Sequence, residues 1–411
     1  MNIYIVNELG SRFNGVGTYV RECINSFRNI SFINLNVIQF NSENYELDIV
    51  VNDKIRYYYF PRFSDFSISP HSDIIVNLLV LYIKDSVNNV FLLNHGPCEL
   101  FMRSIKNLFP LSKIIFVIHN FGWCEKLRGD CELFKKIFNN RRDNKIIANY
   151  KELLDNFDEE ICMYGLTDRL ICLSQDAYDL LIDVYKVNKD KIEIIPNGLS
   201  DCYITLTDQE KINIKKKLFI DTNEQIIIYS GRLNIIKGFD ILLNALDNII
   251  SQGFNCRLIV AGAIFVPEWV FSYLKLNCNK VTFTGYLTSE ELKIWYQIAD
   301  LGVLPSFCEQ CSYTGIEMMM NGLPIVASDG FGVKNMFLDN ENSKIAQIGD
   351  RNNFLVYVNN LSQAIVELLS SDSQSIKLRC GSRKKYLDEY TLFNMMDNYK
   401  KLFQSYLEKQ T

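Results

Sequence analysis

The sequence predicts an α/β protein of two domains, each a parallel β-sheet covered by helices on both faces. Three observations predict this fold. Short apolar runs rich in β-branched residues alternate with longer amphipathic runs, this alternation occurs in two series, and 411 residues suffice for two or three domains. Parallel neighbours need a crossover connection, usually a helix, so alternating strands and helices are the pattern of parallel sheets.

The expected strands fall into two groups along the chain. Those of the first series are Ile3–Val6, Leu35–Phe40, Val90–Asn94, Ile114–Ile118, Arg169–Leu173 and Ile192–Ile195. Those of the second are Gln225–Tyr229, Arg257–Ala261, Val281–Phe283, Leu301–Leu304 and Pro324–Ala327. Helix-length segments such as Gly17–Phe27, Gln175–Tyr185, Phe239–Ile250 and Glu290–Ala299 separate most of them. Open α/β sheets bind ligands at the carboxyl ends of their strands, so the strand-to-helix loops are where chemistry is expected.

Turn residues mark the boundary between the two series. Pro196, Asn197 and Gly198 end the last strand of the first series, and a polar segment follows. We therefore expect an N-terminal domain over residues 1–198 and a C-terminal domain over residues 199–390, with a ligand cleft between them. Residues 391–411 carry apolar side chains at helical spacing and predict a closing helix that packs back toward the N-terminal domain.

Composition excludes several classes of protein. The chain is 48% hydrophobic and has a formal net charge of −5, which excludes a disordered chain and a nucleic-acid binder that acts through bulk positive charge. The segment Met1–Val6 predicts a strand and no signal peptide. The 12 cysteines are scattered, several within apolar runs. We expect a cytoplasmic protein with reduced cysteines.

The loop after the first strand of the second series suits an anion. Arg232 and Lys237 lie between Gly231 and Gly238, where a helix is about to begin. Cations at a helix N-terminus are locally unfavourable, and a phosphate bound between them would reverse that balance. The alternative is a solvated loop with two ordinary surface cations.

A second loop, after Leu301–Leu304, carries two carboxylates. Glu309 lies in the loop, and Glu317 is expected in the first turn of a helix that begins near Thr314 and ends at Gly322. Carboxylates accept hydrogen bonds from hydroxyls and a helix N-terminus donates to phosphate, so this pair could hold a polyol diphosphate. The alternatives are a capping box of Thr314 with Glu317 and a plain exposed acid at Glu309.

Cys308 and Cys311 form a Cys-x-x-Cys pattern in the same loop. A single pair of this kind, without a second pair or a nearby histidine, is weak support for zinc. A redox role would need a thioredoxin-like context, which the sequence does not offer. We therefore expect no metal site.

Taken together, these motifs resemble the retaining GT-B glycosyltransferases of family four. The matching segments are Gly231–Arg232, Lys237–Gly238, Glu309 and Glu317 with seven residues between them, Gly322–Ser328, Pro196–Gly198 and Asn14–Gly17. The likeness covers essentially the whole chain and is tightest over residues 192–330. It implies a GT-B fold of two Rossmann-like domains that face each other across a cleft. It also implies metal-independent transfer of a hexose from a UDP- or GDP-linked sugar to an acceptor hydroxyl.

The resemblance implies roles for individual residues. Glu309 and His119 would form the catalytic set, and both would lie near the transferred sugar. The donor-binding set would be Arg232, Lys237, Glu317, Ser312, Tyr313, Thr314, Gly15, Gly17 and Asn197. Within it, the two cations would bind the diphosphate and Glu317 the ribose hydroxyls. The amides of Tyr313 and Thr314 would meet the distal phosphate, and the glycine-rich loop would lie against the phosphate and the acceptor.

Two segments bear on which sugar is transferred and which acceptor receives it, and neither identity follows from the resemblance. Relatives usually carry Gly-Phe-Gly after the first glutamate, but this chain has Gln310–Tyr313, which alters the floor of the sugar pocket. This variant is similar to a bacterial subgroup that accompanies peptide-modifying radical enzymes, which leaves a peptide acceptor open. A basic stretch over residues 126–145 is either a solvated helix face, an acceptor-binding flap or a contact with anionic lipid, because some relatives use lipid-linked acceptors.

Other functions for this architecture remain open. A dehydrogenase is disfavoured because Val20 stands where the dinucleotide fingerprint of Gly15 and Gly17 needs glycine or alanine, and no ribose-binding acid follows the second strand. A non-catalytic sugar-nucleotide-binding protein and an epimerase or phosphorylase of the GT-B type would share the motifs above.

Overall fold

The computed structural model describes residues 1–8, 15–62, 69–94, 98–262, 265–274 and 277–408. The chain divides into two compact units. Unit 1 contains Met1–Trp123, Glu132–Asn197 and Leu392–Thr411, and unit 2 contains Cys124–Cys131 and Gly198–Thr391. The C-terminal segment thus belongs to unit 1, while a short segment of the first half of the sequence belongs to unit 2.

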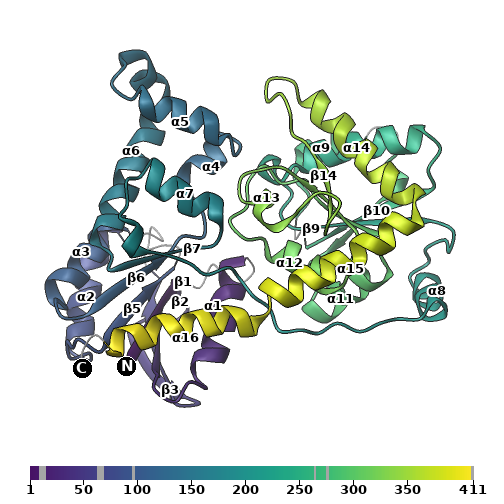
Figure 1. The fold of residues 1–411 in the computed structure, drawn as a ribbon. Coiled ribbons are helices and arrows are strands. Elements are labelled where there is room, and N and C mark those ends of the chain that lie inside the picture. The colour runs from purple at the N-terminus through teal and green to yellow at the C-terminus, as the bar shows by residue number, and fades with distance from the viewer. Residues whose placement is uncertain (9–14, 63–68, 95–97, 263–264, 275–276, 409–411) are drawn as a thin grey trace. The chain divides into compact units, whose positions relative to one another are not determined.

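Unit 1 is built on an eight-stranded sheet of order β3-β4-β2-β1-β5-β6-β7-β8 (Figure 1). The strands are β1 (Asn2–Glu8), β2 (Asn34–Ser42), β3 (Asp48–Asn52), β4 (Ile55–Pro61), β5 (Asn89–Leu93), β6 (Lys113–Val117), β7 (Arg169–Cys172) and β8 (Ile192–Ile194). All neighbours are parallel except β3, which runs antiparallel to β4 at the edge. The central strand β5 is buried along its whole length, as expected for a strand covered on both faces.

Helices surround this sheet and the C-terminal helix completes the unit. They are α1 (Gly15–Phe27), η2 (Ser69–His71), α2 (Ser72–Val80), α3 (Glu99–Leu108), α4 (Gly122–Lys126), α5 (Cys131–Asn139), α6 (Asn144–Leu166), α7 (Gln175–Asp183), η3 (Lys189–Lys191) and α16 (Leu392–Glu408). Helices α4 and α5 each include residues of unit 2. The apolar face of α16 packs on α1, where Tyr399 and Phe403 contact the Phe27 ring.

Unit 2 is built on a six-stranded sheet, parallel throughout, of order β11-β10-β9-β12-β13-β14. The strands are β9 (Gln225–Ser230), β10 (Cys256–Ala261), β11 (Val281–Gly285), β12 (Leu301–Leu304), β13 (Ile325–Ser328) and β14 (Lys344–Ala346). Ile226–Ile228 of β9 and Leu258–Ala261 of β10 are fully buried, so the core of this unit lies around its central strands.

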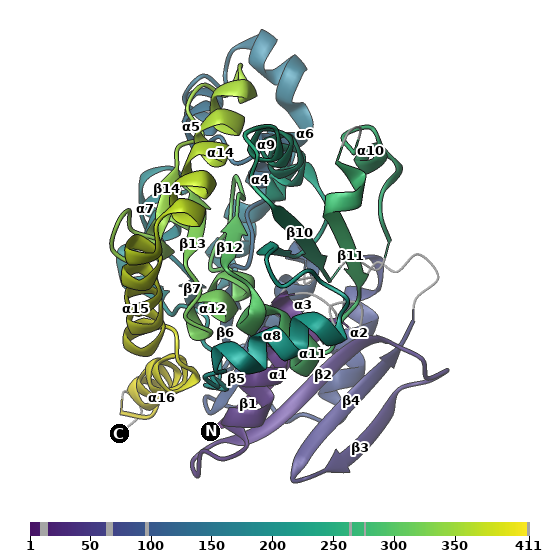
Figure 2. The ribbon, with the colours of Figure 1, turned by 90° about the vertical axis from the view of Figure 1, so that its right-hand side faces the viewer.

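The helices of unit 2 cover both faces of this sheet (Figures 1 and 2). They are α8 (Asp208–Lys217), η4 (Ile235–Lys237), α9 (Phe239–Ser251), α10 (Glu268–Phe271), η5 (Cys278–Lys280), α11 (Ser289–Ile298), α12 (Tyr313–Met320), α13 (Val333–Met336), α14 (Phe354–Ser370) and α15 (Asp372–Glu389). Helix α9 packs against α14, and α12 packs against α15. From β9 the chain adds β10 and then β11 on one side of the sheet, and it then adds β12, β13 and β14 on the other side. The strand order therefore reverses between β9 and β12.

Strands β3, β4 and β14 and helix α8 were not expected from the sequence. The β3–β4 hairpin has an exposed outer strand, whose apolar Val50 and Val51 face solvent, so burial could not predict it. Strand β14 is only three residues long. Helix α8 lies in the polar segment after the boundary and begins at a capping box in which Thr207 and Glu210 bond each other's backbone amides.

Candidate active site

The two loops singled out in the sequence meet at the reversal point of the sheet in unit 2. Strands β9 and β12 are hydrogen-bonded neighbours, and the loops over residues 231–238 and 305–312 follow their carboxyl ends. The crevice at such a reversal point is where open α/β sheets bind ligands. The topology therefore brings the predicted anion loop and the predicted carboxylate loop to one place.

Glycine is required where these loops touch. Gly238 has φ +67°, and a Cβ there would lie 2.0 Å from the Pro305 carbonyl oxygen. The Phe307 amide donates to the Ile236 carbonyl at 2.8 Å, which adds a backbone bond between the two loops. Asn234 caps the short helix η4, and its side chain accepts from the Lys237 amide at 3.1 Å. The backbone that carries Lys237 is thus fixed before any ligand is considered.

The predicted cation Lys237 and the predicted catalytic carboxylate Glu309 form an ion pair. Lys237 Nζ lies 2.6 Å from Glu309 Oε1, which also accepts from the Ser306 hydroxyl at 2.8 Å. The Glu309 side chain is only 10% exposed. The alternative that Glu309 is a plain exposed loop acid is therefore wrong. A partly buried carboxylate with two donors is held in a defined orientation.

Arg232 differs from Lys237. It is exposed, and within the described residues its side chain makes no hydrogen bond or ion pair. Its carbonyl oxygen accepts from the buried Tyr229 hydroxyl at 2.7 Å, which fixes its backbone. Burial raises the pKa of Tyr229, and the Glu309 carboxylate raises it further, so this hydroxyl stays protonated. Arg232 thus has a fixed main chain and a guanidinium available to a ligand.

Helix α12 begins with Ser312 as its N-cap, whose hydroxyl accepts from the Gly315 amide at 3.3 Å. The capping box expected between Thr314 and Glu317 is therefore not formed. Glu317 lies in the second turn and not in the first, and its Oε2 accepts from the Tyr296 hydroxyl at 2.9 Å. Burial and the nearby Glu317 carboxylate raise the pKa of Tyr296, so the phenol remains a donor. Tyr313 and Thr314 occupy the first turn, whose amides favour an anion.

The segment that departs from the family pattern is buried. Gln310 is 4% exposed, and neither atom of its amide group has a hydrogen-bond partner within the described part of the chain. Cys308 and Cys311 are both buried, and the Cys308 thiol lies 2.9 Å from the Cys124 thiol. Among the described residues, no three side chains of the metal-binding types His, Cys, Asp and Glu form a cluster that could hold an ion.

Unit 1 contains the remaining predicted residues. His119 follows β6, and its Nε2 lies 3.1 Å from the Oδ1 of buried Asn94, whose amide nitrogen donates to the Val6 carbonyl. Because an amide oxygen can only accept, Nε2 donates to the Asn94 oxygen. The Tyr19 ring meets the His119 ring edge to face at 4.7 Å. These contacts fix the orientation of the imidazole.

The other residues of the predicted donor set in unit 1 are less informative. Gly15 and Gly17 lie in the first turn of α1, and Asn14, the first residue of the predicted glycine-rich loop, lies outside the described residues. Asn197 is buried after β8, at the end of unit 1. None of these positions establishes contact with a nucleotide.

One functional candidate was assigned wrongly from the sequence. Arg128 was counted in the basic stretch 126–145, but its guanidinium is ion-paired with Asp240 in unit 2, with Nη2 2.6 Å from Oδ2. Asp130 of the same segment pairs with Arg351. This part of the stretch is therefore not an exposed basic face. A glycine follows Arg128 at position 129, where the backbone is left-handed with φ +68°.

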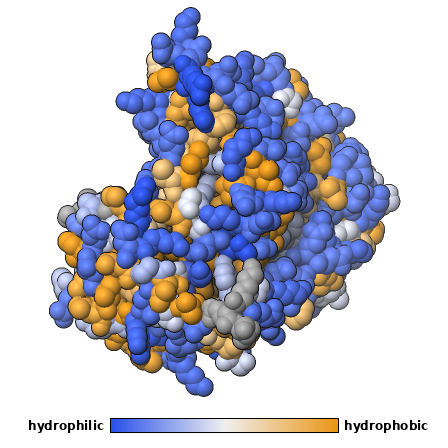
Figure 3. Space-filling view, turned by 60° about the vertical axis from the view of Figure 1, so that its left-hand side comes forward, coloured by the Kyte–Doolittle hydropathy of each residue, from blue (hydrophilic) through white to orange (hydrophobic). Residues whose placement is uncertain are grey.

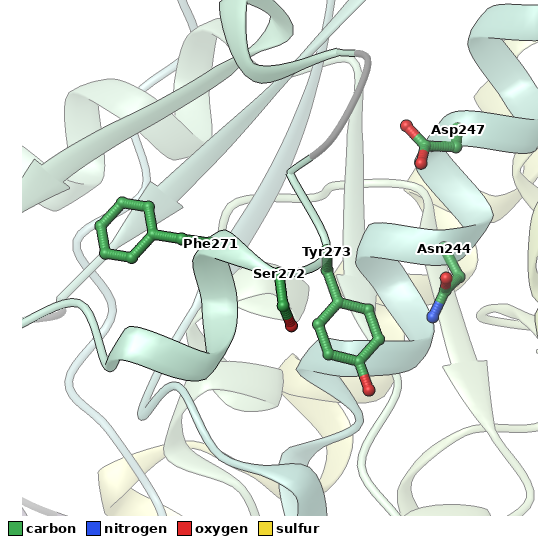
Figure 4. Close-up of a pocket in the computed structure, with 5 residues that line it drawn as sticks. All are labelled: Asn244, Asp247, Phe271, Ser272 and Tyr273. Carbon is green, nitrogen blue, oxygen red and sulfur yellow. The ribbon is translucent and has the colours of Figure 1, made fainter.

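A cavity of about 460 Å³ lies elsewhere in unit 2, between α9 and the residues around α10. Figure 4 shows Asn244 and Asp247 on α9 across from Phe271, Ser272 and Tyr273. Asp247 already accepts from the Asn277 amide at 2.7 Å. The residues that line this cavity include none of the predicted site residues.

The surface in Figure 3 is mostly hydrophilic, with several apolar patches. Exposed apolar side chains of unit 1 include Ile74, Leu81 and Tyr82 at and beyond α2. None of the helices within the described residues is both long enough and apolar enough to cross a bilayer.

The second half of the chain is similar in sequence to known glycosyltransferases. Residues 210–384 match the family described as Glycosyl transferases group 1. An uncharacterized glycosyltransferase of Methanocaldococcus jannaschii is 29% identical over 173 residues, which cover 40% of this chain and 43% of that protein. The match thus spans less than half the length of that relative.

Solved structures match over nearly the whole chain. Sucrose-phosphate synthase from Thermosynechococcus elongatus has a TM-score of 0.72 at 18% identity, and the match covers 98% of this chain and all of that one. HepE of Anabaena in complex with UDP-glucose has a TM-score of 0.70 at 13% identity, covering 98% and 99%. The prediction of a GT-B fold with two Rossmann-like parallel-sheet domains is confirmed.

The family match also bears on the two loops. The matched range 210–384 contains Arg232, Lys237, Glu309 and Glu317. The comparisons show that residues 210–384 are similar to the group 1 glycosyltransferases. The anomeric outcome, the donor base, the acceptor and the roles of individual residues are finer statements that they leave untested.

Proposed function

We propose that this protein is a retaining glycosyltransferase that moves a hexose from a nucleotide-diphosphate sugar to an acceptor hydroxyl. The observation that carries the proposal is the Lys237–Glu309 ion pair at the sheet reversal of unit 2, beside the N-terminus of α12. A cation, a carboxylate and helix amides at one edge are the groups that a sugar diphosphate needs. HepE of Anabaena, a fold relative, has been solved in complex with UDP-glucose, which is such a donor.

In this proposal Arg232 and Lys237 bind the diphosphate of a UDP- or GDP-linked sugar. Arg232 is suited to it because its guanidinium is exposed and has no partner within the described residues. The first-turn amides of α12, at Ser312, Tyr313 and Thr314, donate to the distal phosphate. Glu317 binds the ribose hydroxyls while Tyr296 orients its carboxylate.

The proposed reaction balances without a metal. The bond between the anomeric carbon and the diphosphate oxygen breaks, and a bond from that carbon to the acceptor oxygen forms on the same face of the sugar. The acceptor proton passes to the departing phosphate oxygen. Arg232, Lys237 and the amides of α12 stabilise the charge that develops on the leaving group. Glu309 faces the sugar and positions it, and need not act as a nucleophile of the kind that retaining hydrolases use.

Unit 1 contributes the acceptor side in this proposal. His119 bonds a sugar or acceptor hydroxyl, as the resemblance implies, while the contact of its Nε2 with Asn94 orients the ring. Gly15, Gly17 and Asn197 complete the donor set as the resemblance implies. Saccharide, peptide and lipid-linked acceptors all present a hydroxyl. The lipid alternative loses part of its support, since Arg128 is paired within unit 2 and is not available to a membrane.

The second candidate is a non-catalytic or epimerase-type GT-B protein that binds the same donor. Glu309 discriminates between them, because a binder has no need of an oriented carboxylate beside the diphosphate cation. The test is a screen in which purified protein hydrolyses UDP- and GDP-linked hexoses without acceptor. Release of free sugar from at least one donor, lost in Glu309→Gln, is expected. Binding of a donor without release of sugar would favour the non-catalytic candidate.

A further inference from the structure

A short segment of the first half of the sequence forms part of unit 2. Residues Cys124–Cys131 belong to unit 2, while the chain on both sides of them belongs to unit 1. This segment includes the C-terminal part of α4 and the turn before α5. Its contacts within unit 2 are concentrated on Arg128 and Gly129, and they reach both loops of the candidate site.

Arg128 is held on three sides. Its guanidinium carbon lies 4.3 Å from the centre of the Phe307 ring and 4.2 Å from that of Phe354. Its Nη2 is 2.6 Å from Asp240 Oδ2, and the side chains of the pair are 21% and 10% exposed. A guanidinium over an aromatic face is attracted by the ring quadrupole, and more strongly where the pair is shielded from water. Arg128 is therefore an ordered side chain and not a surface cation.

The backbone of the segment is fixed as well. Arg351 donates to the carbonyl oxygens of Arg128 and Gly129 at 2.7 and 3.3 Å. Arg128 and Gly129 both have left-handed backbone, with φ +49° and +68°. A Cβ at Gly129 would lie 2.3 Å from the Phe307 carbonyl oxygen, so only glycine fits against this loop. A non-glycine residue in left-handed backbone costs free energy and persists when its surroundings hold it.

The partners of Arg128 flank the two residues that form the central ion pair. Phe307 precedes Glu309 by two positions, and Asp240 follows Lys237 by three. Asp240 lies in the first turn of α9, directly after the left-handed Gly238. The Phe307 and Glu309 amides donate to the carbonyls of Ile236 and Phe331 at 2.8 and 3.0 Å. One guanidinium thus contacts the loop of Lys237 through Asp240 and the loop of Glu309 through Phe307.

We propose that Arg128 is a positioning residue for the donor site, which holds the loops of Lys237 and Glu309 in one arrangement. The inference rests on the proposed function, because it assigns the held loops to a donor. Arg128 acts through Phe307 and Asp240 and does not itself bind the sugar nucleotide. The segment 124–131 therefore lets the first half of the sequence determine the geometry of two loops, those of Lys237 and Glu309, that lie in the second half.

Arg383 provides a matched control in the same unit. Its guanidinium also lies over two aromatic rings, 4.8 Å from the centre of Tyr203 and 5.1 Å from that of Tyr386, and it pairs with Asp201. Its side chain is 22% exposed. Arg128→Met and Arg383→Met both remove a guanidinium that stacks on two rings and pairs with an aspartate, and Arg383→Met also removes a donor to the Met320 carbonyl at the C-terminal end of α12. Only Arg128 lies against the two loops.

The experiment compares wild type, Arg128→Met, Arg128→Lys and Arg383→Met. Amide hydrogen exchange at residues 307 and 309 reports loop order, and kcat with KM for sugar release reports the reaction. Arg128→Met is expected to raise exchange at both amides and to lower kcat by about tenfold or more, with a smaller change in donor KM. Arg128→Lys keeps the charge near Asp240 but not the planar stack on the rings. Its exchange rates and kcat are expected to lie between those of wild type and Arg128→Met. Arg383→Met lowers the Tm and leaves both readouts within about twofold.

Each outcome either supports or overturns the positioning role of Arg128. Unchanged exchange and kcat in Arg128→Met, or equal losses in Arg383→Met, overturn the inference. If Arg128→Met does not fold, Phe354→Leu replaces it, because this variant removes one of the two rings that contact Arg128 and keeps the Arg128–Asp240 ion pair. Phe354→Leu must then raise amide exchange at residue 307. If wild type releases no sugar from any donor, the proposed function fails. The exchange measurement then still tells whether Arg128 orders the loops.

Discussion

Lys237 and Glu309 lie 72 positions apart in the sequence, and their side chains form an ion pair with Nζ 2.6 Å from Oε1. Each reaches the pair from a loop at the end of a different strand, and the two strands, β9 and β12, are neighbours. The pair gives each charged group a partner when no ligand is bound. A diphosphate that takes Lys237 would leave the Glu309 carboxylate to a sugar hydroxyl, which is the basis of the predictions below.

Nucleotide-diphosphate affinity should depend on both cations of the β9 loop. Lys237→Met and Arg232→Met are each expected to raise the Kd for UDP or GDP by about tenfold, which is about 1.4 kcal/mol. Calorimetry measures this directly. Lys344→Met is the control, because Lys344 forms a similar pair with Glu367 elsewhere in unit 2, at 2.9 Å. If both site variants bind as tightly as the control, the assignment of this loop to the diphosphate is wrong.

Glu317 should favour a ribonucleotide over a nucleotide that lacks the ribose hydroxyls. Glu317→Gln is expected to weaken binding of the ribonucleotide several-fold and to change binding of the matching 2′,3′-dideoxynucleotide little. The dideoxy ligand lacks the hydroxyls that would donate hydrogen bonds to the carboxylate. Tyr296→Phe removes the donor to Oε2 and should have a smaller effect in the same direction. Competition titrations with the two nucleotides check this. Equal losses for both ligands would remove Glu317 from the ribose.

Stability should fall as Glu160 of unit 1 ionises. Burial raises the pKa of this carboxyl above its ordinary 4.5, although bonds from Tyr185 and the Gly122 amide oppose the increase. The folded state then binds the proton more tightly than the unfolded state. The stabilisation is complete below about pH 4.5 and is lost as the pH rises through the folded pKa.

The free energy of unfolding of wild type should therefore decrease across that window, and Glu160→Gln should abolish this part of the decrease. Glu132→Gln, at an exposed acid of α5, is the control and should leave the pH profile unchanged. Denaturant titrations at several pH values between 4 and 8 measure it. Identical profiles for wild type and Glu160→Gln would contradict the assignment.

Gln310 should lower the stability of the free protein. Its amide is buried, and neither polar atom has a partner within the described residues. Gln310→Leu keeps a similar volume and removes the desolvated polar atoms, so it is expected to raise the free energy of unfolding by about 1 kcal/mol. Thermal and denaturant unfolding test this. A marked loss of stability would show that the amide is bonded in the free protein.

The fold was largely predictable because strand and helix periodicity are local. Residue patterns place the strands from Ile3–Val6 to Pro324–Ala327 correctly to within one or two residues for most of them. The exposed strand β3 and the short strand β14 lack the apolar run that makes a buried strand visible. Glu317 was expected in the first turn because the helix was predicted to begin near Thr314, whereas Ser312 is the N-cap and Glu317 lies just beyond the first turn.

The site was predictable only in part, because sequence motifs report residue types and not partners. The glycines and charges of the two loops indicated an anion site. Pairing of Lys237 with Glu309 needs the strand order, which reverses between β9 and β12. The role of Arg128 needs a contact between residues more than a hundred positions apart, such as its ion pair with Asp240. No local pattern contains that information.

The most direct test of the central claim is a comparison of binding and transfer in Glu309→Gln, with Glu367→Gln as the control. Glutamine keeps the size of the side chain and removes its charge. In Glu309→Gln the kcat for sugar release is expected to fall by about a hundredfold or more, while the Kd for the nucleotide diphosphate changes by less than about threefold. Glu367→Gln should match wild type in both. A Glu309→Gln protein that releases sugar at the wild-type rate would contradict the account.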